Sequence, residues 1–258
     1  MRDLLFALRS GFGFLTTIPV GITMEGIEKL MKHIYLFPVV GAVVGLLLAG
    51  AGYASSAVLP PILTSFVVII SIYYLTGINH IDGLADFGDG IAAHGTREKK
   101  IAAMRDTAVG TGGMIFCIIA ILGVFSSLVS IIEKKELLPN LLPLLPLALI
   151  TAETCAKQTM VTVAAFGKSI HEGFGAMTVD NTKISDLVAG LVFTGAICYI
   201  VLGPIGIGAL IVSQSAGLLV LNTANRHFGG VSGDIVGASN EIGRLAALMF
   251  IGGYVWMP

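Results

Sequence analysis

The chain has 258 residues, of which 55% are apolar and 12% charged, and its mean hydropathy is +0.90. Soluble domains carry about 25% charged residues, so this composition excludes an ordinary soluble domain, a disordered chain and a disulfide-linked secreted scaffold. The net charge of −1 gives no electrostatic reason to expect a nucleic acid partner. The three cysteines lack metal-site or redox spacing, and we interpret them as small apolar core residues.

The apolar residues fall in uncharged runs of near 20 residues, about the length that one helix needs to cross a bilayer. The strands of a transmembrane β-barrel are shorter, at about 10 residues, and alternate in polarity. The sequence therefore predicts an all-α, polytopic membrane bundle of about seven transmembrane helices. We expect residues 1–258 to form one membrane-embedded catalytic domain.

The first predicted element, within residues 1–20, is a helix at the membrane interface. It is not a cleavable signal, because it carries Arg2 and Arg9 and lacks a small-residue cleavage site. Pro19 is expected to end it. Its apolar side would consist of Phe6, Leu8, Phe12, Phe14 and Leu15.

The predicted spans follow in chain order at about 34–59, 61–79, 113–132, 137–156, 187–202, 205–222 and 245–257. Pro139, Pro143 and Pro146 predict a kink or break near the start of the fourth span. Gly203-Pro204 separates the fifth span from the sixth. The seventh is short, because a glycine-rich polar stretch precedes it.

The basic residues predict the orientation. With the N-terminus inside, the inner segments hold 13 Lys and Arg residues and the outer ones only Lys134 and Lys135. We therefore expect a plasma-membrane protein with its polar stretches, 79–112, 157–186 and 223–244, on the cytoplasmic face. Polar residues gathered on one face favour a membrane enzyme. A transporter needs polar groups near the bilayer midplane and access from both sides.

Asp82, Asp86 and Asp89 follow the second span at spacing i, i+4, i+7. On a helix these carboxylates share an arc of roughly 60°, and they repel one another unless a cation lies between them. Mg²⁺ prefers such oxygen ligands and commonly bridges carboxylates to substrate phosphates. The sequence thus predicts a Mg²⁺ site in a segment whose glycines partly unwind it. The alternative is a solvated acidic loop.

A glycine run, Gly110-Thr111-Gly112-Gly113, leads into the third span just after Arg105-Asp106. Free backbone N–H groups and the helix dipole make such a start an anion site. Together with the acidic cluster, this arrangement predicts a diphosphate site. Lys99 and Lys100 are interpreted as positive-inside anchors instead.

A second polar cluster begins at the inner end of the sixth span. Its glycines surround a serine and an aspartate, so its backbone could touch a ligand, and we expect it to share a site with the acidic cluster. The alternative is helix-packing glycines with a helix cap. The cluster comprises Asn222, Asn225, Arg226, Gly229, Gly230, Ser232, Gly233, Asp234, Gly237 and Glu241.

Other ionisable residues leave alternatives open. Glu153 and Lys157, spaced i, i+4 near the end of the fourth span, are a functional pair or an ordinary paired lysine reaching the interface. His171 and Glu172 carry no clear assignment. His80 would point away from the three acids on an ideal helix, so we interpret it as structural or interfacial.

Several of these blocks resemble the adenosylcobinamide-GDP ribazoletransferase (cobalamin synthase) family. The specific match combines Asp82-Gly83-Leu84-Ala85-Asp86 and Asp89-Gly90 with the block from Gly229 to Asp234, followed by Gly237-Ala238 and Glu241. Weaker matches lie at Phe14–Pro19, Phe37–Gly41 and Arg105-Asp106. The resemblance covers most of the chain. This chain departs from the family at Lys157, where an arginine is usual, and at Phe87-Gly88, where small polar residues are common.

The resemblance implies that a ribose hydroxyl of α-ribazole, or of its 5′-phosphate, attacks the cobinamide-side phosphorus of adenosylcobinamide-GDP, with GMP leaving. Asp82 and Asp89 would hold Mg²⁺, and Asp86 would be a ligand or the general base. Asp234 and Glu241 would supply a second metal site or orient a ribose. Lys157 would contact a phosphate without the fork of a guanidinium. The oligomeric state stays open, a homo-oligomer included.

Two rivals remain. Asp86-x-x-Asp89-Gly90-x-x-Ala93 matches the start of a CDP-alcohol phosphotransferase motif, but His94 stands where that family has arginine and its later acidic block is missing. A divalent-cation transporter would need acids buried near mid-bilayer and polar groups on the outer face, and the sequence indicates neither.

Overall fold

The computed structural model describes residues 2–134, 143–170 and 173–256. Across these residues the secondary structure is helical, apart from one isolated bridge between Ser169 and Val231. The predicted all-α class is confirmed. The helices are α1 (Arg2–Leu15), α2 (Met24–Met31), α3 (Phe37–Ser56, after a 3-10 turn at Ile34–Leu36), α4 (Pro61–Thr76), α5 (Asn79–Ala92), α6 (Arg97–Met104), α7 (Thr111–Glu133), α8 (Leu144–Phe166), α9 (Phe174–Asn181), α10 (Ile184–His227) and α11 (Gly233–Tyr254).

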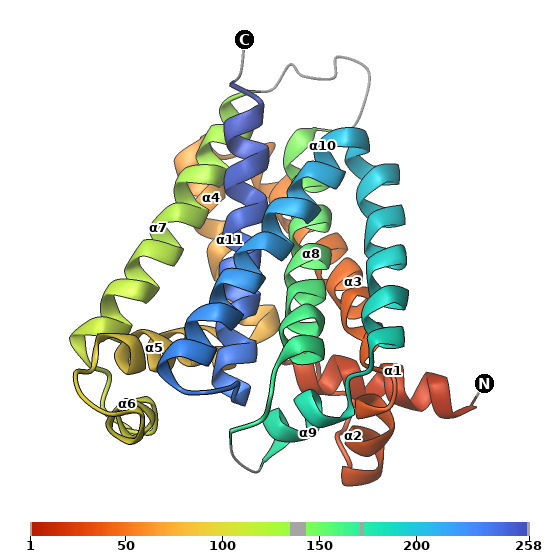
Figure 1. Ribbon diagram of the computed structural model, residues 1–258. Helices are drawn as coiled ribbons and strands as arrows, with labels where there is room; N and C mark the ends of the chain where they lie inside the picture. The colour runs from red at the N-terminus through yellow and green to blue at the C-terminus, as the bar shows by residue number, and fades with distance from the viewer. Residues whose placement is uncertain (1, 135–142, 171–172, 257–258) are drawn as a thin grey trace.

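The long helices form a bundle, and the short helices α1, α2, α5, α6 and α9 gather at one end of it (Figure 1). By length and composition, four helical segments of the described chain could cross a membrane: Ile34–Ser56, α7, α10 and α11. Helices α4 and α5 make a fifth if this pair, bent by 95°, is counted as one span. The polytopic membrane class predicted from composition follows from these segments.

Helix α10 contains two of the predicted spans. At Gly203 the backbone has φ 58°, and Pro204 follows. A left-handed residue before proline interrupts the helix, so α10 runs along the bundle in one limb and returns in the other (Figure 1). These limbs are the runs predicted at 187–202 and 205–222.

Two predicted boundaries are wrong. Helix α8 begins directly after Pro143 and continues to Phe166, so Lys157 lies inside it and not near its end; Pro139 is outside the described residues. The seventh run, predicted at 245–257, belongs to α11, which already begins at Gly233. The first part of α11 contains polar residues that are buried inside the bundle. Hydropathy alone does not detect a helix of that kind.

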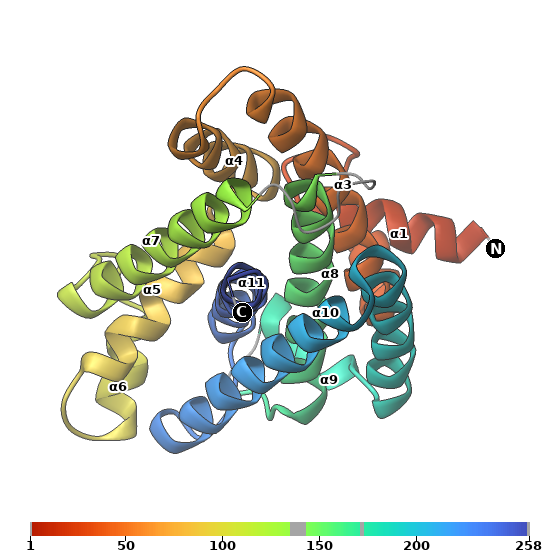
Figure 2. The same cartoon turned by 90° about the horizontal axis from the view of Figure 1, so that it is seen from above.

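Helix α8 is the central helix of the bundle, since almost every residue from Leu144 to Ala164 is buried. Figure 2 shows α3, α10 and α11 arranged around it. Glycines bring α3 against its backbone. A Cβ on Gly41 would lie 2.5 Å from the carbonyl oxygen of Glu153, and one on Gly45 would lie 2.7 Å from Cα of Ile150. Small residues permit this close approach between membrane helices.

The N-terminal helix is present, and the predicted apolar residues Leu8, Phe12, Phe14 and Leu15 lie in or against the core. Helix α1 ends at Leu15, well before Pro19, and it buries Ala7, Ser10, Gly11 and Leu15 against α2 and α3. Leu4 and Leu5 remain exposed. A Cβ on Gly11 would lie 3.2 Å from the side chains of Leu30 and Val40, so small residues bring α1 close to α2 and α3, a packing surface that amphipathicity alone does not specify.

Candidate active site

Helix α5 carries the three predicted acids. Gly77, with φ 69°, ends α4 and turns the chain, so α5 lies across the end of the bundle, outside the spanning helices (Figure 1). The helix is continuous from Asn79 to Ala92, so Asp82, Asp86 and Asp89 share one face. The expected partial unwinding is wrong, because the glycines of α5 serve as close-packing positions against neighbouring helices.

Asp234 comes next to this face from a different part of the chain. Ser232 caps α11 by accepting a hydrogen bond from the backbone N–H of Ile235 at 3.3 Å, which places Asp234 in the first turn. The hydroxyl of Ser232 also donates to Oδ2 of Asp234 at 3.2 Å. A Cβ on Gly83 would lie 2.5 Å from the Asp234 carbonyl oxygen, so only glycine allows α5 to approach α11 so closely. The two predicted clusters therefore meet.

The close approach of α5 and α11 brings four carboxylates into one region of negative charge. Burial, and then the carboxylates of Asp234, Asp82 and Asp89, raise the pKa of Asp86 to about 7. Among the described residues, the ion pairs with lysine or arginine involve other acids, none of them these four. Unpaired carboxylates this close favour a bound cation or a proton.

Asp89 has a structural partner that the sequence analysis missed. Its Oδ2 accepts a hydrogen bond from the N–H of Gly110 at 2.7 Å, and its Oδ1 accepts one from Gly113 at 2.8 Å. A Cβ on Gly110 or Gly113 would clash with this carboxylate. The predicted anion site at the start of α7 exists, but the anion is Asp89. The N–H groups of Gly110 and Gly113 are therefore engaged by that side chain, and Gly112 is a packing position, where a Cβ would lie 2.6 Å from Cβ of Ala92.

The remaining acids suit a metal held jointly with a substrate. In the described ranges, no three His, Cys, Asp or Glu side chains lie close enough to hold a metal ion. Mg²⁺ is commonly bound by one or two carboxylates together with waters and substrate phosphates. Asp82, which is exposed, and the half-buried Asp86 and Asp234 offer that kind of oxygen donor set.

The glycines of the second cluster mainly serve packing. A Cβ on Gly230 would clash with the carbonyl oxygen of Lys168, where the bridge between Ser169 and Val231 joins the two segments. A Cβ on Gly175 would clash with the backbone of Gly233, so α9 is seated directly on the start of α11. Asp234 is therefore the residue of this cluster that lies beside the acidic face of α5. Gly230 and Gly233 allow the neighbouring chain segments to pack closely around it.

The other predicted substrate-binding residues are exposed polar side chains around this end of the bundle. Asn222, Asn225 and Arg226 lie on the last turns of α10, and Arg105 and Asp106 follow α6. Asp106 accepts a hydrogen bond from the N–H of Ala108 at 3.0 Å. Lys100, interpreted above as an anchor, lies 2.9 Å from Nδ1 of His227 and links α6 to the end of α10.

A buried charge network inside the bundle contains the remaining predicted residues. Arg244 donates to both carboxylate oxygens of Glu241, each at 2.7 Å, and also pairs with Glu153. Lys157 donates to Oδ1 of Asn240 at 2.6 Å. These charged side chains are at most 2% exposed.

This network corrects two expectations. Glu241 is engaged by Arg244 and by the hydroxyl of Tyr73 at 3.3 Å, so it is not a second metal ligand beside the aspartates. Glu153 pairs with Arg244, and Lys157 is fully buried and donates to Asn240, which excludes the alternative of an ordinary paired lysine reaching the interface. The signal that was missed is Arg244 itself, three residues after Glu241 and therefore on the same helix face. His171 and Glu172 lie outside the described residues.

A membrane bundle with carboxylates of two helices gathered at one end defines a polytopic membrane enzyme. The chain belongs to the cobalamin-5-phosphate synthase family, whose model matches residues 7–252. It is 41% identical to the adenosylcobinamide-GDP ribazoletransferase of Methanosarcina barkeri over 99% of both chains. It is 43% identical to that of Methanosarcina mazei, covering 97% of this chain and 93% of the relative. A relative of the same name from Geotalea daltonii is 29% identical over 92% of each chain. No solved structure matches. The resemblance stated from the motifs is confirmed.

Proposed function

We propose that this protein catalyses the reaction named in its relatives, the transfer of adenosylcobinamide phosphate from adenosylcobinamide-GDP to α-ribazole or its 5′-phosphate. The observation that carries the proposal is the near full-length match to these relatives in a chain whose two acidic motifs converge at Asp82, Asp86 and Asp234. The product is adenosylcobalamin or its 5′-phosphate, and GMP is released.

The reaction forms one P–O bond and breaks another. The ribose hydroxyl attacks the cobinamide-side phosphorus, the bond from that phosphorus to the bridging oxygen breaks, and the bridging oxygen leaves with GMP. The hydroxyl proton must pass to a base within hydrogen-bond reach. Asp86 is our candidate, because its carboxylate experiences the charge of Asp82, Asp89 and Asp234 and binds a proton more readily than an isolated carboxylate.

Asp82 and Asp234 would hold Mg²⁺ together with the diphosphate, which leaves Asp86 free to act as the base. The ion would offset the charge on the bridging and leaving oxygens. Asp89 contributes indirectly, because it holds α7 against α5 and so keeps the acidic face in place. Arg105 and Arg226 are exposed at the same end of the bundle and suit contacts with the outer phosphate.

We further propose that this end faces the cytoplasm and that the chain lies in the plasma membrane with its N-terminus inside, as the distribution of Lys and Arg favours. The short helices at this end would lie near the cytoplasmic surface (Figure 1). A homo-oligomer is compatible with the exposed apolar surface of the spanning helices, which lipid also covers.

The test is GMP release by purified protein in detergent, given adenosylcobinamide-GDP and α-ribazole, with and without Mg²⁺. Asp82→Ala is expected to abolish release, and Asp180→Asn is the matched control, because Asp180 is an exposed aspartate of α9 at the same end. Release that depends on both α-ribazole and Mg²⁺, and that is lost only in Asp82→Ala, is the expected result.

No release from a preparation that is folded and binds Mg²⁺ would refute the proposal. The rivals would then be tested by CMP release from CDP-alcohols and by cation flux in liposomes. The structure gives the transporter little support. The acids buried inside the bundle, Glu153 and Glu241, are both paired with Arg244 and do not form a free cation site.

A further inference from the structure

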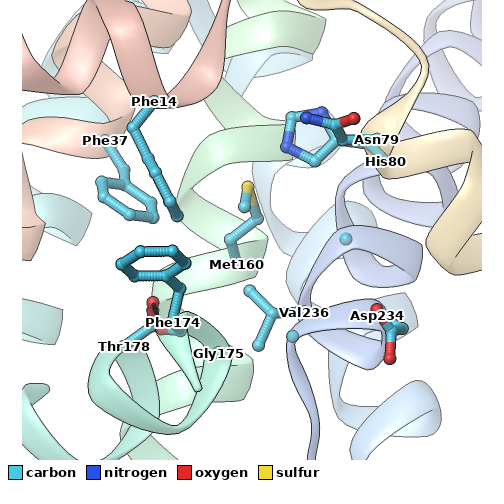
Figure 3. Close-up of a pocket in the computed structure, with 12 residues that line it drawn as sticks. Phe14, Phe37, Asn79, His80, Met160, Phe174, Gly175, Thr178, Asp234 and Val236 are labelled. Atoms are coloured by element: carbon cyan, nitrogen blue, oxygen red, sulfur yellow. Dashed lines mark hydrogen bonds between the residues drawn. The ribbon is translucent and has the colours of Figure 1, made fainter. Parts of the chain in front are cut away.

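A cavity of about 260 Å³ lies beside the acidic cluster, between the N-terminal helices and the start of α11 (Figure 3). Asp234 is part of the cavity wall, and its carboxylate is close enough to Asp86 to affect the charge there. The cavity and the acidic cluster are therefore adjacent. Its volume is slightly below the ~300–1,000 Å³ of pockets for drug-sized ligands. A bicyclic base with part of its sugar suits this volume, whereas a corrinoid ring does not.

The two sides of the cavity differ in chemistry. On one side lie Phe14, Phe37 and Phe174, from α1, α3 and α9 (Figure 3). The ring centroids of Phe14 and Phe37 are 6.4 Å apart, as are those of Phe14 and Phe174 in an edge-to-face arrangement. Met160 and Val236 extend this apolar wall. A planar apolar group would be held here by contacts with the aromatic rings.

On the other side lie Asn79, His80 and Asp234 (Figure 3). His80 is 7% exposed, and its ring belongs to the cavity wall on the side nearest the acids. A ligand hydroxyl in the cavity would meet the edge of this ring beside Asp234.

The two nucleosides of the proposed reaction, guanosine and α-ribazole, have bases whose edges differ in polarity. Guanine carries N–H and C=O groups that need hydrogen-bond partners when they are buried. The phenylalanine side offers only the Thr178 hydroxyl, whose proton is already donated to the Phe174 carbonyl oxygen at 2.9 Å. The dimethylbenzimidazole base of α-ribazole has a hydrocarbon edge with two methyl groups. The apolar side therefore suits the benzimidazole and not guanine.

Resting on the proposed function, we infer that this cavity is the acceptor subsite: Phe14, Phe37 and Phe174 enclose the benzimidazole, and His80 and Asp234 face its ribose. In this arrangement the attacking hydroxyl points toward Asp86 and the diphosphate. The donor nucleotide then occupies the exposed polar end beside Arg105 and Arg226.

The test measures binding apart from turnover, by equilibrium dialysis of the full chain in detergent with α-ribazole and, separately, with GMP. Phe14→Ala and Phe174→Ala are expected to raise the Kd for α-ribazole roughly 5- to 50-fold and to leave the Kd for GMP unchanged. Both residues are partly exposed, so the variants should fold. Phe66→Ala is the matched control and should change neither Kd, because Phe66 is an exposed phenylalanine of α4 that does not line the cavity.

His80→Leu separates the two sides of the cavity. It should raise the Kd for α-ribazole but not the Kd for free 5,6-dimethylbenzimidazole, because only the riboside has hydroxyls to meet the imidazole ring. A riboside of unmethylated benzimidazole should bind roughly 10- to 200-fold more weakly than α-ribazole, the range for missing methyl groups in an apolar pocket.

Three results would overturn the inference. The wild-type protein does not bind α-ribazole, both phenylalanine variants keep the wild-type Kd for α-ribazole, or these variants raise the Kd for GMP and not the Kd for α-ribazole. The proposed function fails in a different way. If α-ribazole binds in a Phe174-dependent manner but no GMP is released, the subsite stands and the reaction is wrong. If GMP is released and both variants keep the wild-type KM for α-ribazole, the reaction stands and the subsite is wrong.

Discussion

Replacing Glu153 by glutamine removes one charge from the buried network inside the bundle. Glu153 and Glu241 share the Arg244 guanidinium, and Lys157 lies one turn from Glu153 on α8, so two acids balance two bases. All four side chains are at most 2% exposed. Glu153→Gln keeps the volume but leaves one positive charge in excess, with little water to solvate it.

Removing one partner of a buried ion pair costs about 3–5 kcal/mol. For domains of 150–250 residues, about 1 kcal/mol lowers the Tm by 2–4 °C. Glu153→Gln should therefore lower the Tm by roughly 6–20 °C. The double variant Glu153→Gln/Lys157→Met restores the charge balance and should recover at least ~1 kcal/mol, a coupling typical of residues in one network.

The assay is thermal unfolding in detergent, followed by far-UV circular dichroism and by a fluorogenic thiol reagent. Cys155 and Cys198 are completely buried, so the reagent reaches them only when the bundle opens. Asp180→Asn, at an exposed site, should change stability by less than about 0.5 kcal/mol. A Tm decrease below about 2 °C for Glu153→Gln, or a double variant less stable than the single one, would refute the view that the network is dry and charge-balanced.

Three further results are expected. Asp89→Ala, which removes the cap of α7, should cost about 0.5–2 kcal/mol in unfolding measurements, whereas Asp82→Ala should keep its Tm and lose turnover; equal stability losses in both would contradict these roles. Gly83→Ala should lower Tm and GMP release together, because its Cβ meets the backbone of α11, whereas Gly50→Ala, with open space around it, should be neutral or stabilising by up to about 1 kcal/mol. Chelation of divalent cations should stop GMP release reversibly without lowering Tm, since no metal is needed for the packing described here; a large Tm decrease would indicate a structural metal instead.

The spanning helices could be predicted from the sequence because apolar length is a local property. Each run had to be long enough to cross a bilayer, and Gly203-Pro204 marked the bend in α10 without any knowledge of its neighbours. The face shared by Asp82, Asp86 and Asp89 was also local, since it follows from the helical repeat. Lys and Arg counts, summed over short loops, were sufficient to predict an orientation.

The partners of these groups were decided only by tertiary structure. Helical periodicity shows which residues share a face but not what that face contacts. Asp89 therefore looked identical to Asp82, although it caps a helix that begins 22 residues later. Glu241 looked like a metal ligand, but the structure pairs it with Arg244, which also pairs with Glu153 of α8.

The cavity shows the same limit. Phe14 and Phe37 occur in two short motifs of the sequence, and nothing local indicates that the Phe14 ring meets both Phe37 and, across 160 residues of chain, Phe174. The membrane bundle and the acidic face could be predicted because they depend on residues close together in the chain, and the family could be recognised because motifs are compared along the sequence without any knowledge of contacts. Folding decided which acids remain free to bind a ligand, since pairing and burial depend on distances of a few ångströms between separate helices.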